Sequence, residues 1–252
     1  MPFFRLSLVA LLAAGISAAD SREPVAVRTL KAGAQLLTYS YGTLGLFRVH
    51  VLRFSPGEVE LRYVSPPAGR TLSTVDAMSG CSDAVACVNA SFFEAETDRP
   101  IGLIVSSGKV LQRLKKVSWG VFWIDSRGQA HVTGPKAFAS EVDVDHEVRF
   151  AVQSTPMLIA DGKKKKPSDR RRARRTVLGA DSQGRILVAS FPFPIAHTDV
   201  ATFMKEHLGA VQLMNLDGGS STQLVIPGDA AGLVTGVPVA NGLGLFPVEA
   251  GR

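Results

Sequence analysis

Cysteine is scarce in this sequence, which limits the sites that the chain can build. Only Cys81 and Cys87 occur among 252 residues, and no second Cys or His pair lies near them to complete a tetrahedral zinc site. The five histidines form no His-x-x-x-His pair, so no dedicated metal site is predicted. No cofactor is predicted either, because Gly242-Leu-Gly244 is too short for a dinucleotide fingerprint and no helix pattern follows it.

Long apolar runs are absent after the first twenty residues. Within those residues, Leu6 to Ile16 is almost wholly apolar, Arg5 precedes the run, and the small residues Ser17-Ala-Ala19 follow it. The run is shorter than the roughly 20 residues that span a bilayer. The pattern therefore predicts a signal peptide over residues 1–19, cleaved near Ala19, with an uncleaved anchor as the alternative. The mature chain is expected to be periplasmic or secreted, without a transmembrane segment.

Export would determine the oxidation state of the two cysteines. In an oxidising compartment, a nearby pair such as Cys81 and Cys87 favours a disulfide over two free thiols. The ring would be short, and it would brace the approach to Asn89.

Acidic residues do not balance the basic ones, and the excess is confined to one segment. The chain carries +6 at pH 7, yet Lys163 to Arg175 alone holds nine basic residues and one acid, a local charge of +8 that leaves −2 for the rest. The pattern is typical of a solvated, mobile loop, here at about 163–174. The alternative is a patch that attracts an anionic glycan, phospholipid head groups or another anionic envelope polymer. Aromatic residues are absent from the run, so nucleic acid is not an expected partner.

Short strand patterns dominate the rest of the chain, and they outnumber helix patterns. One good helix is predicted from about Thr198, which can cap it, to Leu208, with Gly209 ending it. Thr71 to Met78 is a shorter helix candidate. Without a regular strand–helix alternation, the expected class is α+β: a single domain over 20–252 with a large mixed, mostly antiparallel sheet and a few helices. The predicted strands include Ala34–Ser40, Leu46–Phe54, Val59–Val64, Thr176–Ala180 and Arg185–Ser190.

Four acids alternate with other residues between positions 141 and 147. As a strand, this segment would place Glu141, Asp143, Asp145 and Glu147 on one face. A solvated strand face is favoured. A calcium site is the alternative, because four carboxylates supply the oxygen ligands that calcium prefers.

Two apolar strand patterns end in polar residues. Val211 to Leu216 runs into Asp217-Gly-Gly-Ser-Ser221, where two glycines let backbone N–H groups converge beside a carboxylate and two hydroxyls. Ala84 to Val88 runs into Asn89, and Glu94 follows. The first stretch alone is equally compatible with a plain hairpin turn, since Asp-Gly is common there. Together the two stretches favour a polar site at the ends of two strands.

Six motifs occur in one order over about 160 residues. They are V-N-A-S-F-F-E at 88–94, R-P-I-G-L-I-V-S-S-G-K-V at 99–110, Q-S-T-P at 153–156, R-T-V-L-G at 175–179, N-L-D-G-G-S-S-T at 215–222 and V-P-V-A-N-G-L-G at 237–244. In these motifs the sequence resembles the phosphodiester glycosidase family, which includes many exported bacterial proteins. The resemblance implies that family's fold and an exported hydrolase of a sugar-1-phosphodiester, with a role in envelope glycan or exopolysaccharide processing.

The resemblance also implies a site, carried over position by position. Two departures concern the substrate more than the fold. The family often has two glycines where this chain has Ala90 and Ser91, and three glycines after the aspartate where this chain has two and then Ser220. The residues implied to lie together at the site are Asn89, Arg175, Asp217, Gly218, Gly219 and Asn241.

The residue types suit cleavage of a sugar-1-phosphodiester at the anomeric carbon. The leaving group is a phosphate monoester with a second pKa of about 6, so anion binding matters more than a strong general acid. Arg175, with Arg99 as a second candidate, can grip phosphate oxygens, and the amides of residues 218–221 can add donors. Asp217 is predicted to face the anomeric carbon as nucleophile or as the base for water, with Glu94 as the second carboxylate. The residues predicted to bind substrate are Asn89, Arg99, Gln153, Thr176, Gly218, Gly219, Ser220, Ser221 and Asn241.

Two other functions are weighed against this one. A non-catalytic periplasmic module could bind an anionic glycan in the same pocket. A Ser-His-Asp triad could be assembled from Ser220, His197 and Asp217, but the Gly-x-Ser-x-Gly elbow that would support it is absent.

Overall fold

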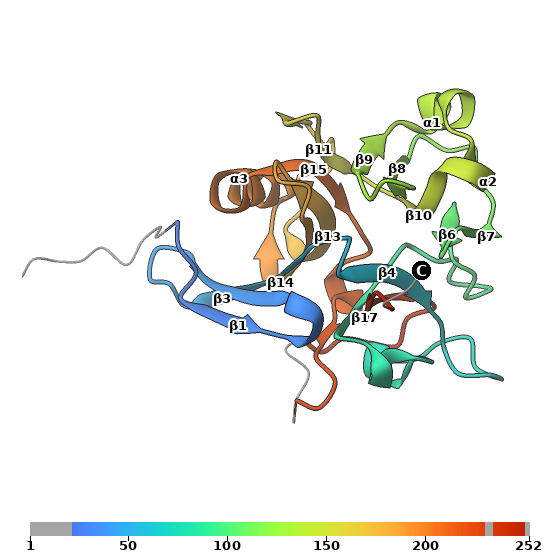
Figure 1. Cartoon of the computed structure of the whole chain (residues 1–252). Coiled ribbons are helices and arrows are strands. Elements are labelled where there is room, and N and C mark those ends of the chain that lie inside the picture. The colour runs from blue at the N-terminus through green and yellow to red at the C-terminus, as the bar shows by residue number, and fades with distance from the viewer. Residues whose placement is uncertain (1–21, 230–233, 250–252) are drawn as a thin grey trace, which may run out of the picture.

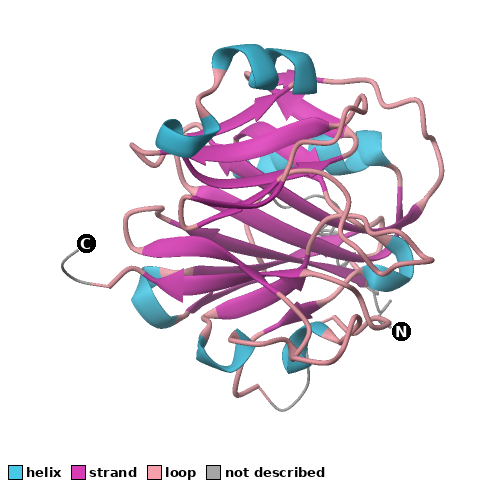
Figure 2. Cartoon of the chain, turned by 90° about the vertical axis from the view of Figure 1, so that its right-hand side faces the viewer, coloured by secondary structure: helices cyan, strands magenta, loops and turns pink. Residues whose placement is uncertain are grey.

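The structure is a computed structural model that describes residues 22–229 and 234–249 (Figure 1). The predicted signal peptide, residues 1–19 with its cleavage position near Ala19, lies outside the described residues. Within the described ranges, no helix is both long and apolar enough to cross a membrane. Strands make up most of the regular structure, and the helices lie around them (Figure 2).

The largest sheet has eight antiparallel strands. Its two longest strands lie side by side in the middle and are almost wholly buried, because apolar side chains occupy both of their faces. In spatial order the strands are β1 (Ala26–Thr29), β2 (Gln35–Tyr41), β3 (Phe47–Phe54), β14 (Ile186–Ile195), β13 (Ala173–Asp181), β15 (Ala210–Asn215), β11 (Met157–Ala160) and β12 (Lys163–Lys164).

Two smaller sheets, also antiparallel, complete the fold. The five-stranded sheet is ordered β7 (Lys109–Gln112), β6 (Ile104–Ser106), β10 (Val148–Ser154), β8 (Gly120–Asp125) and β9 (Ala130–Thr133). The four-stranded sheet is ordered β16 (Leu224–Val225), β5 (Ala86–Asn89), β17 (Gly242–Pro247) and β4 (Val59–Val64). The expected α+β class with mostly antiparallel strands is confirmed, and the strands divide among three sheets.

The core lies on both faces of the eight-stranded sheet. On one face, Leu178 and Val188 pack in a single cluster with residues of both smaller sheets, such as Val88 and Phe150. On the other face, side chains such as Phe191 pack against the helix α3 (His197–Leu208). Each large apolar side chain buried in this way stabilises the fold by about 1.5–3 kcal/mol. Successive residues of β13 point to opposite faces of the sheet, which matters for the candidate site.

The longest helix is close to its predicted span. The sequence pattern predicts a helix over residues 198–208, and α3 spans His197–Leu208. Gly209 ends it in the left-handed conformation, with φ 63°. Thr198 lies inside the helix and Ala196 occupies the N-cap position without a side-chain hydrogen bond, so the predicted capping role of Thr198 is wrong.

Two other predictions of secondary structure are also wrong. The segment 71–78 holds only a 3-10 turn, η2 (Val75–Ala77), not a helix. The four acids lie on no strand, because α1 (Pro135–Glu141) and α2 (Val144–Glu147) divide them. Pro135 starts the first helix, and Asp143 caps the second by accepting from the Asp145 N–H. The remaining 3-10 turns are η1 (Lys31–Gly33), η3 (Cys81–Asp83) and η4 (Gly219–Ser221).

The predicted disulfide is present. Cys81 in η3 and Cys87 in β5 are bonded, with their Cα atoms 6.1 Å apart, and both residues are buried. β5 continues from Cys87 to Asn89, so the bond ties the base of that strand to the preceding turn.

This bond gives a first testable result. We expect thiol labelling of the unreduced, denatured protein to modify neither Cys81 nor Cys87, since the two cysteines of the chain are paired with each other. Labelling after reduction should modify both and serves as the control. Two reactive thiols before reduction would contradict the disulfide.

Candidate functional site

Asn89 ends β5 and joins two sheets at the candidate site. Its side chain is completely buried. Its Oδ1 accepts hydrogen bonds from Thr176 Oγ1 (2.7 Å) and from the Gln223 backbone N–H (3.0 Å), and its Nδ2 donates to the Asp217 carbonyl (2.7 Å). Asn89 belongs to the four-stranded sheet and Thr176 to the eight-stranded sheet, so one side chain fixes the Asp217 loop to both. Buried polar groups are stable when they are hydrogen-bonded in this way.

Asp217 lies just beyond the end of β15, where the chain leaves the sheet. The Leu216 N–H donates to the Thr176 carbonyl of β13 (2.9 Å), and the Asp217 N–H donates to the Ala90 carbonyl that follows β5 (2.9 Å). The main chain of Asp217 is thus held on both sides. The residue as a whole is partly exposed, and its backbone is fixed.

The two glycines after Asp217 allow this path. A Cβ on Gly218 would lie 2.7 Å from the Arg174 carbonyl oxygen, and Gly219 has φ 61°, a conformation that favours glycine. The Gly218 N–H donates to Asp217 Oδ1 (2.8 Å), and the Ser221 N–H donates to the Gly218 carbonyl (3.1 Å). Two of the four amides expected to bind phosphate are therefore used inside the loop. Those of Gly219 and Ser220 have no acceptor among the described residues.

The ionisation of Asp217 is perturbed. Burial raises the pKa of its carboxyl above the ordinary value, because removal from water disfavours the charged form. The Ser221 side chain and the Gly218 N–H hydrogen-bond to the carboxyl and act in the opposite direction. Carboxyl groups with perturbed pKa values cluster at functional sites, where a more basic carboxylate is better suited to accept a proton.

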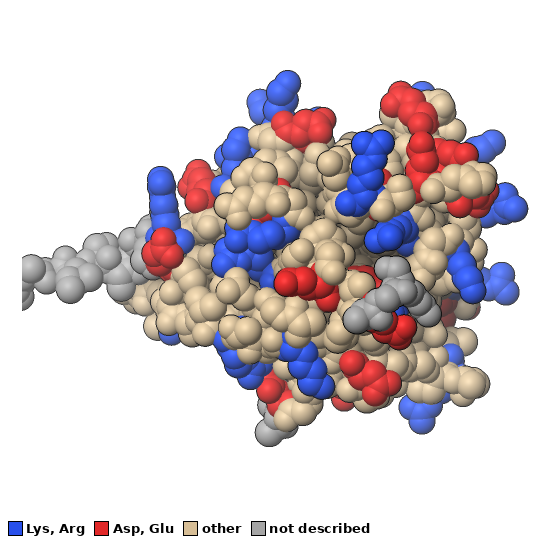
Figure 3. Space-filling view, in the orientation of Figure 1, with Lys and Arg blue, Asp and Glu red and all other residues tan. Residues whose placement is uncertain are grey.

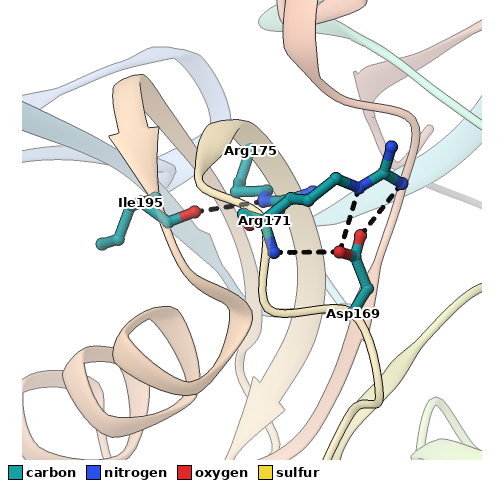
Figure 4. Close-up of polar contacts among 4 residues, drawn as sticks. All are labelled: Asp169, Arg171, Arg175 and Ile195. Atoms are coloured by element: carbon teal, nitrogen blue, oxygen red, sulfur yellow. Dashed lines mark hydrogen bonds and ion pairs between the residues drawn. The ribbon is translucent and has the colours of Figure 1, made fainter.

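Arg175 lies on the α3 side of β13, because it alternates with Thr176, which faces Asn89. The residue is 7% exposed. Its Nε donates to the Ile195 carbonyl (3.3 Å), and a terminal nitrogen donates to the Arg171 carbonyl (2.6 Å) (Figure 4). Burial lowers the pKa of the guanidinium. Two of its five N–H donors are occupied by these bonds.

Sheet pairing places Arg175 near the Asp217 loop. Val177 pairs with Asn215 across β13 and β15, and Arg175 and Asp217 each lie two residues beyond this pair, at neighbouring strand ends. The two side chains form no ion pair in the described part of the chain. A cation and a carboxylate therefore lie near the ends of two adjacent strands without forming an ion pair.

His197 and Asn215 border the same region; the sequence brought His197 to it only through the disfavoured triad, and Asn215 was not predicted as a site residue. His197 is 2% exposed, and burial and then the Arg175 charge lower the pKa of its imidazole, while the Asp169 backbone and Asn215 act in the opposite direction. Both ring nitrogens of His197 and Oδ1 of Asn215 nevertheless lack a hydrogen bond of ordinary geometry. Buried polar atoms without such partners are rare. The neighbours of His197 are Asn215, Asp169 and Arg175, and the triad with Ser220 that the sequence disfavours is not assembled.

Glu94 lies on a surface loop apart from the Asn89 network. Its carboxylate forms an ion pair with Lys115 Nζ (3.1 Å) and accepts a hydrogen bond from Thr97 Oγ1 (3.1 Å). These contacts, and more weakly the Arg99 charge, lower the pKa of Glu94. Arg99 is exposed on the same loop, where its carbonyl accepts from the Glu94 N–H. The structure therefore brings Glu94 and Arg99 together, and among the described residues neither forms a hydrogen bond with the Asn89 network.

Two predicted substrate-binding residues are used inside the protein. Gln153 is completely buried; its Oε1 accepts from the backbone N–H groups of Leu103 and Lys115, and its Nε2 donates to the Lys115 carbonyl. Asn241 accepts from the Ser91 N–H (2.8 Å) and donates to the Ser91 carbonyl (3.1 Å). Their amide groups position loops, and so does the Thr176 hydroxyl through Asn89. The substrate-contacting role of these side chains stays a prediction.

Arg174 and Gln223 support the Asp217 loop, and neither was predicted as a site residue. A terminal nitrogen of Arg174 donates to the carbonyls of Thr222 (2.5 Å) and Thr235 (2.6 Å). Gln223 accepts from the Val75 N–H (3.0 Å) and donates to the Val237 carbonyl (2.8 Å). Arg174 is the last residue of the predicted mobile loop, yet it lies in β13 and holds two loops together.

The site lies where the strands β5 and β15 end. A cavity of about 250 Å³ lies elsewhere, between β4 and β10, and no residue of the Asp217 loop lines it. Among the described residues, no group of three or more His, Cys, Asp or Glu side chains could hold a metal ion. What the site offers is one partly exposed carboxylate, two free amides and nearby cationic and imidazole groups.

Comparison with solved structures shows the same fold in known proteins. The catalytic domain of zebrafish N-acetylglucosamine-1-phosphodiester alpha-N-acetylglucosaminidase, auto-inhibited by a pro-peptide, is similar with a TM-score of 0.65 and 16% identity, over 90% of this chain and 86% of that chain. A hypothetical protein from Synechocystis has a TM-score of 0.59 and 15% identity, over 88% of this chain and 64% of that chain. A protein from Burkholderia pseudomallei has a TM-score of 0.54 and 14% identity, over 87% and 76%. At these identities the likeness shows the fold alone.

Comparison by sequence identifies the family. No curated protein matches the chain. The profile of the phosphodiester glycosidase family matches residues 82–246, well over half of the 252 residues. The matched range contains Asn89, β13, the Asp217 loop and Asn241, which are the parts of the candidate site described above. The chain therefore belongs to the phosphodiester glycosidase family.

Proposed function

We propose that this protein is a hydrolase that cleaves a sugar-1-phosphodiester at the anomeric carbon. The observation that supports this most strongly is Asp217, a partly exposed carboxylate whose pKa is raised by burial and whose backbone is fixed between two sheets. Family membership supports the reaction class. The zebrafish enzyme of similar fold acts, by its name, on an N-acetylglucosamine-1-phosphodiester.

The proposed reaction replaces one bond at the anomeric carbon. The bond between this carbon and the bridging phosphate oxygen breaks, and its electron pair leaves with the phosphate monoester. A water oxygen forms the new bond to the carbon, and its proton is lost to a base. Asp217 acts either as that base or as the nucleophile of a covalent intermediate that water then hydrolyses. The phosphate monoester has a second pKa of about 6, so it departs without a strong acid.

Anion binding is assigned to groups around the strand edge. The free amides of Gly219 and Ser220 can donate to phosphate oxygens. Arg175 has donors left over from its two backbone contacts. His197, with its pKa lowered, is neutral near pH 7 and can donate one N–H. Asp217 is the principal reacting carboxylate of the proposal, and Glu94, which is paired with Lys115, is the second carboxylate.

Arg175 and its neighbour Arg171 provide a matched pair of substitutions. We expect Arg175→Lys to lower kcat/KM by about 30-fold, equivalent to about 2 kcal/mol, because lysine keeps the charge but loses the planar fork. Arg171→Lys should change kcat/KM little, since its side chain is exposed and bonds to Asp169. Kinetics in low and high salt check this. Equal losses from both substitutions, both suppressed by salt, would remove Arg175 from the site.

A second candidate function is a non-catalytic module that binds an anionic glycan. The position of Glu94 favours it, because an exposed carboxylate with a lowered pKa is a poor general acid. Turnover of a panel of synthetic sugar-1-phosphate diesters separates the two functions. Sugar released by the native protein and not by Asp217→Asn supports the hydrolase. Tight binding of the diesters without any release of sugar would support the module instead.

We also propose that the protein is exported and acts on envelope or secreted glycans. The apolar segment 6–16 with its small-residue end and the Cys81–Cys87 disulfide both support an oxidising compartment. Cell fractionation with N-terminal sequencing of the purified protein tests this. A mature N-terminus near Asp20 in the periplasm or medium is expected, and an intact Met1 in the cytosol would contradict it.

A further inference from the structure

The hairpin between β2 and β3 ends in an apolar tip. Leu44 is 75% exposed and Leu46 is 74% exposed, the largest exposed fractions among the large apolar residues of the described chain, and Phe47 beside them is 49% exposed. The two leucines flank Gly45 at a convex turn, so no groove of the protein covers them. Such side chains on a monomer normally mark a contact surface. We call residues 42–47 the hairpin tip.

The hairpin tip is held in place. Arg48 donates to the carbonyls of Gly45 and Phe47, the latter over 3.2 Å. The ring of Phe47 stacks on Phe193 with a centroid separation of 4.7 Å, and Tyr41 stacks on the same ring at 5.1 Å. The base of the hairpin is therefore packed on β14, and the leucines are displayed beyond it.

The basic segment, Lys163 to Arg172, reaches the same region of the surface. Lys164 Nζ donates to Thr202 Oγ1 (3.0 Å), and Arg172 forms an ion pair with Asp199 (3.2 Å). Thr202 and Asp199 of α3 line one cavity, of about 240 Å³, together with Tyr41 of the hairpin. The base of the hairpin tip and the basic segment thus meet on the same side of α3.

The charge of this region is strongly positive. The basic segment holds seven Lys and Arg residues and a single acid, and all seven basic residues are exposed. That acid, Asp169, is already paired with Arg171. On the face shown in Figure 3, Lys and Arg side chains gather to the left of the centre. Arg171 and Arg172 are paired with acids, whereas Lys163, Lys165, Lys166 and Arg170 form no ion pair in the described part of the chain and can attract an external anionic surface.

We propose that the hairpin tip and the basic segment form a docking surface for an anionic lipid bilayer. A convex apolar tip can enter the interface between head groups and acyl chains, while exposed cations attract anionic head groups. A folded protein partner would need a complementary hollow for the tip, whereas a fluid bilayer does not. The proposal does not depend on the hydrolysis proposed above, and a variant without turnover should still dock.

Tryptophan placed at the tip tests insertion directly. We expect Leu46→Trp fluorescence to be quenched by phosphatidylglycerol vesicles with brominated acyl chains. Leu111→Trp is the matched control, since Leu111 is also exposed (54%) but lies on β7, far from the hairpin in Figure 1. The two variants share residues 1–21, so that segment contributes equally to both. Quenching at position 46 no greater than at position 111 would overturn the proposal.

Charge neutralisation tests the basic segment. Replacing Lys163, Lys165, Lys166 and Arg170 with Gln in the Leu46→Trp background should weaken vesicle binding at least about tenfold, because each cation near an anionic surface contributes about 1 kcal/mol. Phosphatidylcholine vesicles and high salt should also reduce binding. The matched control replaces four exposed residues far from the hairpin with Gln: Lys109, Arg113, Lys116 and Arg127. An equal loss of vesicle binding from this control would overturn the role of the basic segment. Tight binding to soluble dextran sulfate without quenching by vesicles would assign the surface to a soluble polyanion and overturn the lipid proposal.

Discussion

The substitution Asp217→Asn is expected to lower kcat/KM for a sugar-1-phosphodiester by about 10³–10⁴-fold, the range typical of losing a reacting carboxylate. Asparagine has nearly the same shape, but it can neither accept a proton nor attack the anomeric carbon. The backbone position should persist, because the Asp217 N–H and carbonyl make the anchoring bonds to Ala90 and Asn89. Steady-state kinetics of the purified variant measure the loss. Activity within tenfold of the native value would remove Asp217 from the reaction.

The stability of the same variant is an internal control. A carboxyl whose folded-state pKa is raised contributes stability that is fully present below the unfolded-state pKa and is lost as pH rises through the folded-state pKa. At pH 7 the buried Asp217 carboxylate is therefore a cost to folding, and Asp217→Asn should leave the melting temperature unchanged or higher. Asp76→Asn, at an exposed position of η2, controls for the chemistry of the substitution and should change neither activity nor stability.

The pH dependence follows from the same shift. If Asp217 reacts as the carboxylate, kcat/KM falls on the acid side, and its half-point lies above the ordinary aspartate value of 3.8 because burial raises the pKa. An acid limb below 3.8 would show that a different carboxyl controls the reaction. Glu94 would be the first to consider, since its pKa is lowered.

Asn89→Ala is expected to cause the largest loss of stability, about 3 kcal/mol in the free energy of unfolding. The change leaves the Thr176 hydroxyl, the Gln223 N–H and the Asp217 carbonyl without a partner inside the protein. Each such loss typically costs about 1 kcal/mol or more. For a chain of this size, 3 kcal/mol corresponds to a fall of roughly 10 °C in the melting temperature. Activity should fall as well, because the Asp217 loop loses its attachment to β5.

Thr176→Val is the graded control for this prediction. It removes one of the three hydrogen bonds of Asn89 and keeps the size of the side chain, so the expected cost is about 1 kcal/mol. Urea unfolding of the native protein and both variants measures the two free-energy differences. If Asn89→Ala costs no more than Thr176→Val, then Asn89 does not act as the joint between the two sheets.

Much of the strand content could be predicted, because the fold is built from local patterns. Val, Ile, Leu and Phe with Gly or Pro turns between them mark β2, β3, β4, β13 and β14, and the periodicity of residues 200–208 marks α3. The helices of the acidic segment could not be predicted from alternation alone. Pro135 and the cap at Asp143 determine their starts, and those local signals outweigh a period of two.

The candidate site shows more clearly what local sequence patterns cannot predict. Motif positions correctly indicated that Asn89 and the Asp217 loop meet, but not which side chains face a ligand. Asn89, Gln153 and Asn241 are polar and appear in motifs, yet their amides bind the protein's own backbone. His197 and Asn215 were not assigned because their unpaired atoms arise from the packing of α3 against the end of β15, which no spacing in the sequence reveals. The role of each polar residue depends on long-range pairing.

Hydrolysis in water enriched in ¹⁸O tests the central proposal most directly. A phosphodiester glycosidase breaks the bond to the anomeric carbon, so the new oxygen must appear in the released sugar. A phosphodiesterase attacks phosphorus, and the label then appears in the phosphate product. Mass spectrometry of both products, corrected for exchange at the free anomeric hydroxyl with a control of unlabelled sugar, distinguishes the two. We predict unlabelled phosphate monoester and labelled sugar; labelled phosphate would contradict the assignment of Asp217 to attack at the anomeric carbon.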